Sequence, residues 1–111
     1  MSELDGLRWA MAEERFAGRE YVGAARLLVE IVESDPSNVS ARLLLARSYF
    51  HSARLTKAYD ECGVLLEQDP TEPYARLLMA RTCERLSKTV EARAHRRLLA
   101  IMSGDDAVFG E

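Results

Sequence analysis

Cysteine, long apolar runs and clusters of basic residues are all scarce in this chain. Its two cysteines, Cys62 and Cys83, are too few for a disulfide scaffold. No uncharged apolar run is long enough to span a bilayer. The first residues, Met1 to Asp5, lack the basic start and apolar core of a signal peptide. We therefore expect a cytoplasmic protein with no membrane partner.

Positive charge is also too low for a dedicated nucleic-acid binder, which is normally distinctly basic. Fifteen Lys and Arg stand against 18 Asp and Glu, giving a net charge of -3. The hydrophobic content of 48% excludes a disordered chain. A chain of 111 residues is the size of one domain and buries enough surface on folding for a core.

The residues for enzyme chemistry are sparse. The only histidines, His51 and His95, lie far apart in the chain, and no glycine-rich phosphate loop or Cys-x-x-Cys pair is present. Glu91 and His95 stand four residues apart, a spacing that suits two metal ligands on one helix, but no further His or Cys is placed to complete a site. We expect no enzyme, no cofactor and no metal. Cys62 and Cys83 are expected to be small buried hydrophobes.

A repeat of 34 residues is the main positive feature. Residues 41–47 (ARLLLAR) match residues 75–81 (ARLLMAR) at six of seven positions, and an Asp-Pro pair recurs at 35–36 and 69–70. Alanine recurs at this interval in two columns: Ala12, Ala46 and Ala80, and Ala24, Ala58 and Ala92. Small side chains at such positions allow two helices to approach to about 8 Å.

The spacing of apolar residues predicts helices within and between these repeated segments. Apolar residues predict helices over 40–53, 56–68 and 90–102, with breaks at 35–38 and 69–73. Pro73 suits the first turn of a helix, and Thr56 and Thr89 are expected to cap helix starts with their hydroxyl groups. No stretch alternates between apolar and polar residues for long enough to predict a β-strand. The predicted fold class is all-α, with six helices in three hairpins.

The period, the recurring alanines and the closing Asp-Pro resemble the tetratricopeptide repeat. The resemblance implies a superhelix of three stacked hairpins in one domain, at residues 5–38, 39–72 and 73–106, followed by a tail at 107–111. The large aromatic residue of the family's fourth position is replaced by Arg8, Arg42 and Arg76. We expect these arginines at the hairpin edges, covering apolar surface with their stems.

The resemblance also implies that the first helix of each hairpin lines a concave groove. The positions that face it are Trp9, Glu13, Phe16, Leu43, Arg47, Phe50, His51, Tyr74, Leu77, Arg81, Glu84 and Arg85. This composition suits a short peptide with an apolar anchor and a carboxylate, because arginine binds carboxylates bidentately. The alternative is that the aromatic residues pack against the neighbouring unit and that the arginines are solvated or form salt bridges.

One subtype of the family grips the C-terminal carboxylate of chaperones with lysine, asparagine and arginine at fixed positions. The corresponding residues are Trp9, Glu13, Leu44, Tyr74 and Leu78. None has the required type, which argues against chaperone-tail binding by that mechanism.

Two functions follow. The first is a non-catalytic adaptor that binds a protein or peptide partner in the groove. The alternative is a self-assembling structural protein that forms a homo-oligomer through an uncapped third repeat, with the patch Val90, Leu98, Ile101 and Met102. Two readings of the tail compete with this alternative: Ala107, Val108 and Phe109 fold back as a cap, or Phe109 anchors in the groove of a neighbouring molecule.

Overall fold

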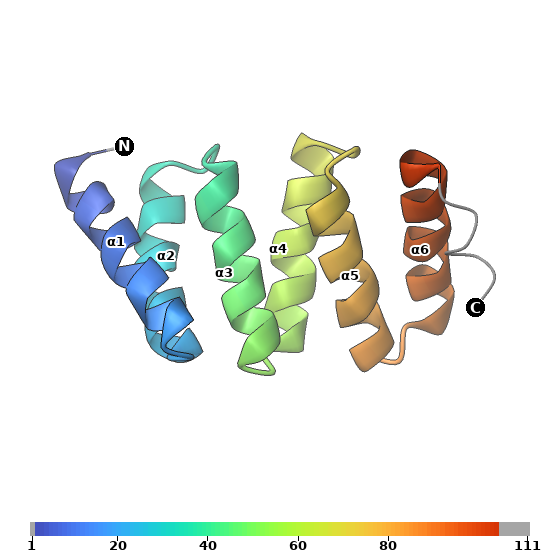
Figure 1. Cartoon of the computed structure of the whole chain (residues 1–111), viewed down its shortest axis with the longest axis horizontal. Coiled ribbons are helices and arrows are strands. Elements are labelled where there is room, and N and C mark those ends of the chain that lie inside the picture. Colours follow the sequence, from blue (N-terminus) through green and yellow to red (C-terminus); the bar gives the residue numbers. More distant parts are fainter. Residues whose placement is uncertain (1, 105–111) are drawn as a thin grey trace.

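Helices follow one another along the whole described part of the chain, residues 2–104, in the computed structural model. They are α1 (Glu3–Ala17), α2 (Tyr21–Ser34), α3 (Val39–His51), α4 (Leu55–Gln68), α5 (Pro73–Arg85) and α6 (Thr89–Ser103). No strand occurs in these residues, so the all-α prediction is confirmed. The helices stand side by side in chain order, with α1 and α6 at opposite ends (Figure 1). None of these helices combines the length and apolarity that crossing a membrane requires.

The same backbone turn closes each of the three hairpins. Arg19, Ala53 and Ser87 stand 34 residues apart, and all have left-handed φ angles, of 63°, 61° and 61°. In each turn the next residue donates its backbone N–H to a carbonyl five residues earlier, at 2.8 Å. This is the bonding of a Schellman motif, which satisfies carbonyls at the end of the first helix. The second helix begins directly after it.

Side chains cap the helices that begin a new hairpin. The Asn38 Oδ1 atom accepts the backbone N–H of Ala41 at 3.0 Å, and a Glu72 carboxylate oxygen accepts that of Ala75 at 2.9 Å. Pro73 occupies the first turn of α5, as predicted, where a missing N–H costs little.

The predicted threonine caps are wrong. The residues before α4 and α6 are Arg54 and Lys88, and neither makes a side-chain capping hydrogen bond. Thr56 and Thr89 lie inside their helices because the Schellman turn carries the chain into the next helix without an extended residue at which a hydroxyl group could cap.

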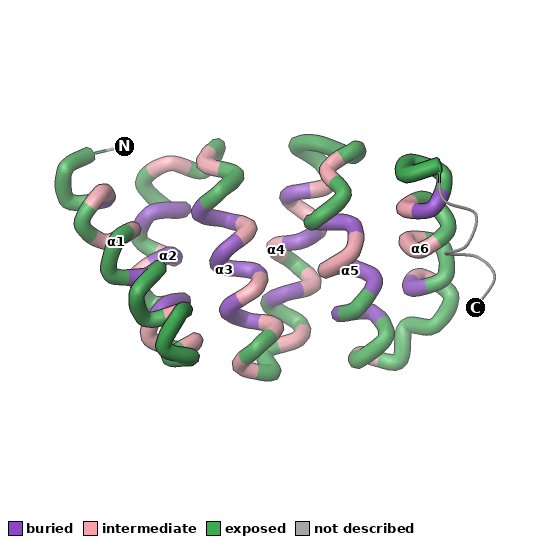
Figure 2. The backbone as a smooth tube through the Cα atoms, in the orientation of Figure 1, coloured by how far each residue is buried: buried purple, intermediate pink, exposed green. Residues whose placement is uncertain are grey.

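Alanines fill the places where helices cross. Ala12, Ala46 and Ala80 on the first helices are fully buried, as are Ala24 and Ala58 on the second helices. The buried residues form runs on the facing sides of neighbouring helices, whereas the outer sides of α1 and α6 are mostly exposed (Figure 2). The core is therefore a row of contacts between neighbours, as a linear helical repeat requires. Cys62 and Cys83 are free and buried within it, as predicted.

The recurring arginines are not at the hairpin edges. Arg42 and Arg76 are each only 9% exposed. Arg42 Nη1 donates to Glu61 Oε1 at 2.7 Å, and Arg76 Nη1 lies 3.1 Å from His95 Nδ1, so both side chains bridge the two helices of a hairpin. The remaining amino group of each donates to a carbonyl of the preceding loop, that of Pro36 or Pro70. A guanidinium group has enough donors for both tasks, and burial leaves only the Nε atom of each arginine without a hydrogen-bond partner among the described residues.

Arg8 bridges the first hairpin in a related way. Its Nη1 atom donates to Asp5 Oδ1 at 2.8 Å, and its Nε atom lies 2.8 Å from Glu30 Oε2. The hydroxyl group of Ser34 donates to the other oxygen of Asp5 at 2.6 Å. These bonds hold the open end of the hairpin together.

Candidate functional site

A pocket of about 180 Å³ opens between α3 and α5. It is lined by Arg47, Phe50, His51, Tyr74, Leu77, Leu78 and Arg81. Each helix contributes residues three and four positions apart, which lie on one face of a helix. The pocket exists because the first helices of two successive hairpins turn matching faces toward each other.

The lining divides into an apolar and a polar part. Leu77 and Leu78 are half-buried, whereas Tyr74 and Arg81 are exposed, Tyr74 by 62%. An apolar side chain can displace water from the leucines, while a nearby guanidinium is available to an anionic group.

Aromatic rings extend this surface toward α1. His51 stacks on Tyr21 with ring centroids 4.8 Å apart, and Phe16 meets both rings edge-on at 5.2 and 5.8 Å. Phe50 also contacts His51 edge-on, at 5.6 Å. Offset and edge-on contacts of this kind add stability beyond the buried area. We call Phe16, Tyr21, Phe50 and His51 the aromatic cluster.

Two arginines cover the aromatic cluster. The guanidinium of Arg47 lies 4.7 Å from the centroid of Phe16, and that of Arg85 lies 5.0 Å from the centroid of Phe50. Burial, followed by the charges of Arg47 and Arg85, lowers the pKa of His51 below its usual 6.5. At neutral pH the imidazole is therefore uncharged, and the positive charge of this surface comes from arginine.

The structure separates the predicted groove residues into groups. Six of them line the pocket, namely Arg47, Phe50, His51, Tyr74, Leu77 and Arg81. Phe16 and Arg85 adjoin it through the ring contacts described above. Trp9 and Leu43 are half-buried and pack against the two core clusters, and Glu13 is exposed on α1. Glu84 is held by Arg96 of α6 through two bonds, at 2.6 and 2.9 Å, which lowers the pKa of its carboxyl group.

The predicted set of groove residues omits two residues of this surface, Leu78 and Tyr21. Leu78 stands four residues after Tyr74, a spacing that places both on one helix face. Tyr21 lies at the start of a second helix, and only the hairpin turn brings its ring beside His51.

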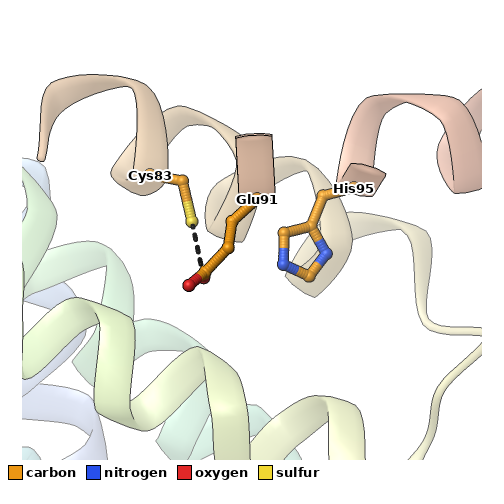
Figure 3. A group of neighbouring side chains, drawn as sticks. All are labelled: Cys83, Glu91 and His95. Atoms are coloured by element: carbon orange, nitrogen blue, oxygen red, sulfur yellow. Dashed lines mark hydrogen bonds between the residues drawn. The ribbon is translucent and has the colours of Figure 1, made fainter. Parts of the chain in front are cut away.

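A separate group of three side chains that carry metal-ligating atoms lies between α5 and α6 (Figure 3). Ligand atoms of Cys83, Glu91 and His95 all lie within 4.8 Å of one another. The expectation that no further Cys or His joins Glu91 and His95 is therefore wrong. Cys83 belongs to the preceding helix, and the turn between α5 and α6 brings its thiol group to the pair.

Other hollows are less suited to a specific ligand. One of them, of about 560 Å³, surrounds the first hairpin turn and is lined by Met11, Glu14, Arg15, Gly18 and Glu20. Charged side chains of both signs make up most of this lining, and Met11 is the apolar side chain among its lining residues. A smaller hollow of about 240 Å³ lies between the start of α5 and the end of α6.

Comparison with known proteins gives a sequence match and several matches of fold. The family model described as Tetratricopeptide repeat matches residues 15–82. No curated protein sequence matches the chain.

Three similar solved structures illustrate the match of fold. The first TPR of Spaghetti (RPAP3) bound to an HSP90 peptide has a TM-score of 0.85 at 16% identity, with 95% of this chain and 83% of that chain covered. The Arabidopsis OM64 TPR domain has a TM-score of 0.84 at 16% identity, with 96% and 88% covered. The Sgt2 TPR domain from Aspergillus fumigatus has a TM-score of 0.82 at 16% identity, with 94% and 69% covered. At these identities the likeness is one of fold.

Proposed function

Because the chain belongs to the tetratricopeptide repeat family, we propose that it is a non-catalytic adaptor that binds a peptide or helix of a partner protein between α3 and α5. The observation that carries the proposal is the pocket itself, in which half-buried leucines lie beside exposed tyrosine and arginine. Interfaces derive most of their binding energy from such aromatic and arginine anchors.

The lining specifies the chemistry of the ligand. Leu77 and Leu78 favour an apolar side chain, which would be removed from water on binding. Arg81 favours a carboxylate within a few residues of that side chain, because a guanidinium group binds carboxylates through two parallel hydrogen bonds. Arg47 is held over Phe16 and is already oriented beside the pocket. The ligand is therefore a short segment that combines an apolar residue with Asp, Glu or a C-terminus.

The mode of binding differs from the chaperone-tail clamp. The similar RPAP3 structure contains an HSP90 peptide, but the clamp positions in this chain are Trp9, Glu13, Leu44, Tyr74 and Leu78. Leu44 is buried and cannot contact a ligand, and none of the others carries a positive charge. We propose that the carboxylate contacts Arg81 instead.

A binding role also fits the functional groups of the pocket. Its lining contains one imidazole, that of His51, and neither a carboxylate nor a thiol group. The leucines and arginines that make up most of the lining are suited to recognition of a ligand and not to proton transfer or nucleophilic attack.

A peptide array tests the proposal. Immobilised peptides that vary an apolar residue and a neighbouring carboxylate are probed with the full chain, and fluorescence anisotropy then gives the dissociation constant of the best ones. We expect peptides with both features to be selected. Arg81→Glu should weaken binding at least tenfold, and the exposed Arg93→Glu on α6 is the matched control. Selection that ignores the carboxylate, or equal losses in both variants, contradicts the proposal.

Self-assembly is a second candidate function, favoured by the two ends of the helical stack. On α1, Leu4 and Leu7 are 54% and 58% exposed, and on α6, Val90 and Ile101 are 81% and 64% exposed. Two unlike apolar ends permit a head-to-tail contact between copies. Leu98 and Met102, also predicted for this patch, are 43% and 38% exposed.

Light scattering separates this candidate from the adaptor. If copies associate through their ends, the mass should rise with concentration in the wild type and fall to that of one chain in Ile101→Glu. The competing readings of the tail, in which residues 107–109 form a cap or Phe109 binds a neighbour, concern residues outside the described part of the chain.

A further inference from the structure

Cys83, Glu91 and His95 combine three kinds of metal-binding atom at one place in the third hairpin. Cys83 comes from the end of α5, and Glu91 and His95 come from successive turns of α6 (Figure 3). The Cys83 thiol group donates a hydrogen bond to Glu91 Oε2, with 3.7 Å between sulfur and oxygen, and the ligand atoms of all three residues lie within 4.8 Å of one another.

We propose that these three residues bind a single Zn²⁺ ion, with water at the fourth position. Thiolate, imidazole and carboxylate are the groups that bind zinc in proteins. Bond lengths of about 2.3 Å to sulfur and 2.0 Å to oxygen in a tetrahedral site imply a sulfur–oxygen separation of about 3.5 Å. The observed 3.7 Å is close to this value.

Repeat packing does not account for the cluster. One repeat earlier, the equivalent positions hold Tyr49, Lys57 and Glu61, and two repeats earlier they hold Arg15, Gly23 and Leu27. The same backbone geometry therefore forms without any group of metal-binding residues. The three donors are a property of the third hairpin alone.

A neighbouring side chain already orients one of the three ligands, Glu91. The Tyr59 hydroxyl group, on α4, donates to Glu91 Oε2 at 2.7 Å and fixes the position of that carboxylate. Outer hydrogen bonds of this kind are common around protein metal sites and strengthen binding. Cys83 is buried whereas Glu91 and His95 are half-buried, so an ion can reach the donors from solvent.

Arg76 competes with the metal for His95. Its Nη1 atom lies 3.1 Å from His95 Nδ1. Because arginine only donates, Nδ1 accepts this bond, and the ring proton is on Nε2. Binding through Nδ1 displaces Arg76, while binding through Nε2 moves the proton to Nδ1 and also breaks the bond. Arg76 keeps its bond to the carbonyl of Pro70, at 2.7 Å, in either case.

Charge balance is favourable once the thiol group loses its proton. A thiol group binds zinc as a thiolate, so Cys83 must lose its proton when the ion binds. Zinc forms its bond to sulfur as that proton leaves to solvent. The resulting thiolate and Glu91 neutralise the two charges of the ion, while the positive charges of Arg76, beside His95, and of Lys88, which acts on Glu91, oppose it.

Metal titration of the full chain tests the proposal. After treatment with a chelator, Zn²⁺ is added in competition with a chromophoric chelator, and Co²⁺ is added separately to detect a thiolate–cobalt absorption band. We expect one ion per chain, a higher melting temperature with Zn²⁺, and a cobalt band. Less than one ion per chain, or no thiolate band, would overturn the site.

Variants assign the ligands. Cys83→Ser should abolish the cobalt band, and His95→Gln should weaken Zn²⁺ binding at least tenfold. Cys62→Ser is the matched control, because Cys62 is the other buried thiol and lies outside the cluster. If Cys83→Ser does not fold, the half-buried His95→Gln decides the result alone. Unchanged affinity in His95→Gln, or loss of the cobalt band in Cys62→Ser, would overturn the assignment.

Discussion

Arg42 and Glu61 are joined across the second hairpin by an ion pair of 2.7 Å between largely buried side chains. One repeat later the same two positions hold Arg76 and His95, which lie 3.1 Å apart. The carboxylate of the second hairpin thus gives way to a neutral ring in the third. That exchange keeps a polar link between the helices and leaves an imidazole beside Cys83 and Glu91.

Removing the carboxylate of the second hairpin should destabilise the fold. Glu61→Ala leaves Arg42 buried with only the carbonyl of Pro36 as a partner, and we expect a loss of about 2–4 kcal/mol in the free energy of unfolding. Glu61→His reproduces the pair of the third hairpin and should cost less. Urea denaturation measures both, and equal losses would contradict the argument.

Enlarging a crossing alanine should overpack the core. Ala58 is fully buried, so Ala58→Leu should lower the free energy of unfolding by about 1–3 kcal/mol. The exposed Ala94 on α6 is the control, and Ala94→Leu should change stability by less than about 0.5 kcal/mol. Thermal and urea denaturation of both variants provide the comparison.

Glycine should stabilise the second hairpin turn. Ala53 has a φ of 61°, which costs a residue with a Cβ atom about 1–2 kcal/mol. Glycine removes this strain but adds freedom to the unfolded chain, so we expect Ala53→Gly to gain about 0.5–1 kcal/mol. Ala94→Gly, inside a helix, should instead lose about 1 kcal/mol. A loss in Ala53→Gly would show that the turn is not strained.

Stability should fall in acid partly through Asp5. Hydrogen bonds from Ser34 and then Arg8 lower its pKa below the usual 3.8. The unfolded chain therefore takes up this proton at a higher pH than the folded chain. The contribution of Asp5 is complete above about pH 4 and is lost as the pH falls through the lowered pKa.

Urea denaturation at pH 6 and pH 3 measures this loss. The difference in free energy of unfolding between the two pH values should be smaller in Asp5→Asn than in the wild type. Asp60→Asn, at an exposed position of α4, makes the same change in charge and is the control. An unchanged difference in Asp5→Asn would count against the prediction.

The repeat explains why so much of the fold could be predicted. Alanine at a fixed interval identifies the helix crossings, because only a small side chain fits there, and Pro73 marks the start of a helix. The prediction that Thr56 and Thr89 cap helices was wrong because backbone hydrogen bonds, and not side chains, close these turns. Such a turn has no characteristic side chain that a sequence pattern could detect. Arg19, Ala53 and Ser87 share a left-handed φ angle but have unlike side chains.

The candidate sites show more clearly how far a site can be predicted from the sequence. The resemblance to the repeat family implied that Tyr74, Leu77 and Arg81 face one groove, and all three line one pocket. Spacing could not relate Cys83 to Glu91, because the two are separated by a change of chain direction. Contacts across a turn depend on its geometry, and a pattern search within one helix does not detect them.

The row of helices in chain order has a consequence for how the molecule opens. Each helix packs mainly on those next to it in the chain, and within residues 2–104 no extensive packing joins α1 to α6. Among the described helices, α1 packs mainly on α2 and α6 on α5, whereas α3 and α4 each have a packed neighbour on both sides. Fraying should therefore start at the two ends and advance inward, and amide hydrogens in α3 and α4 should exchange with solvent last.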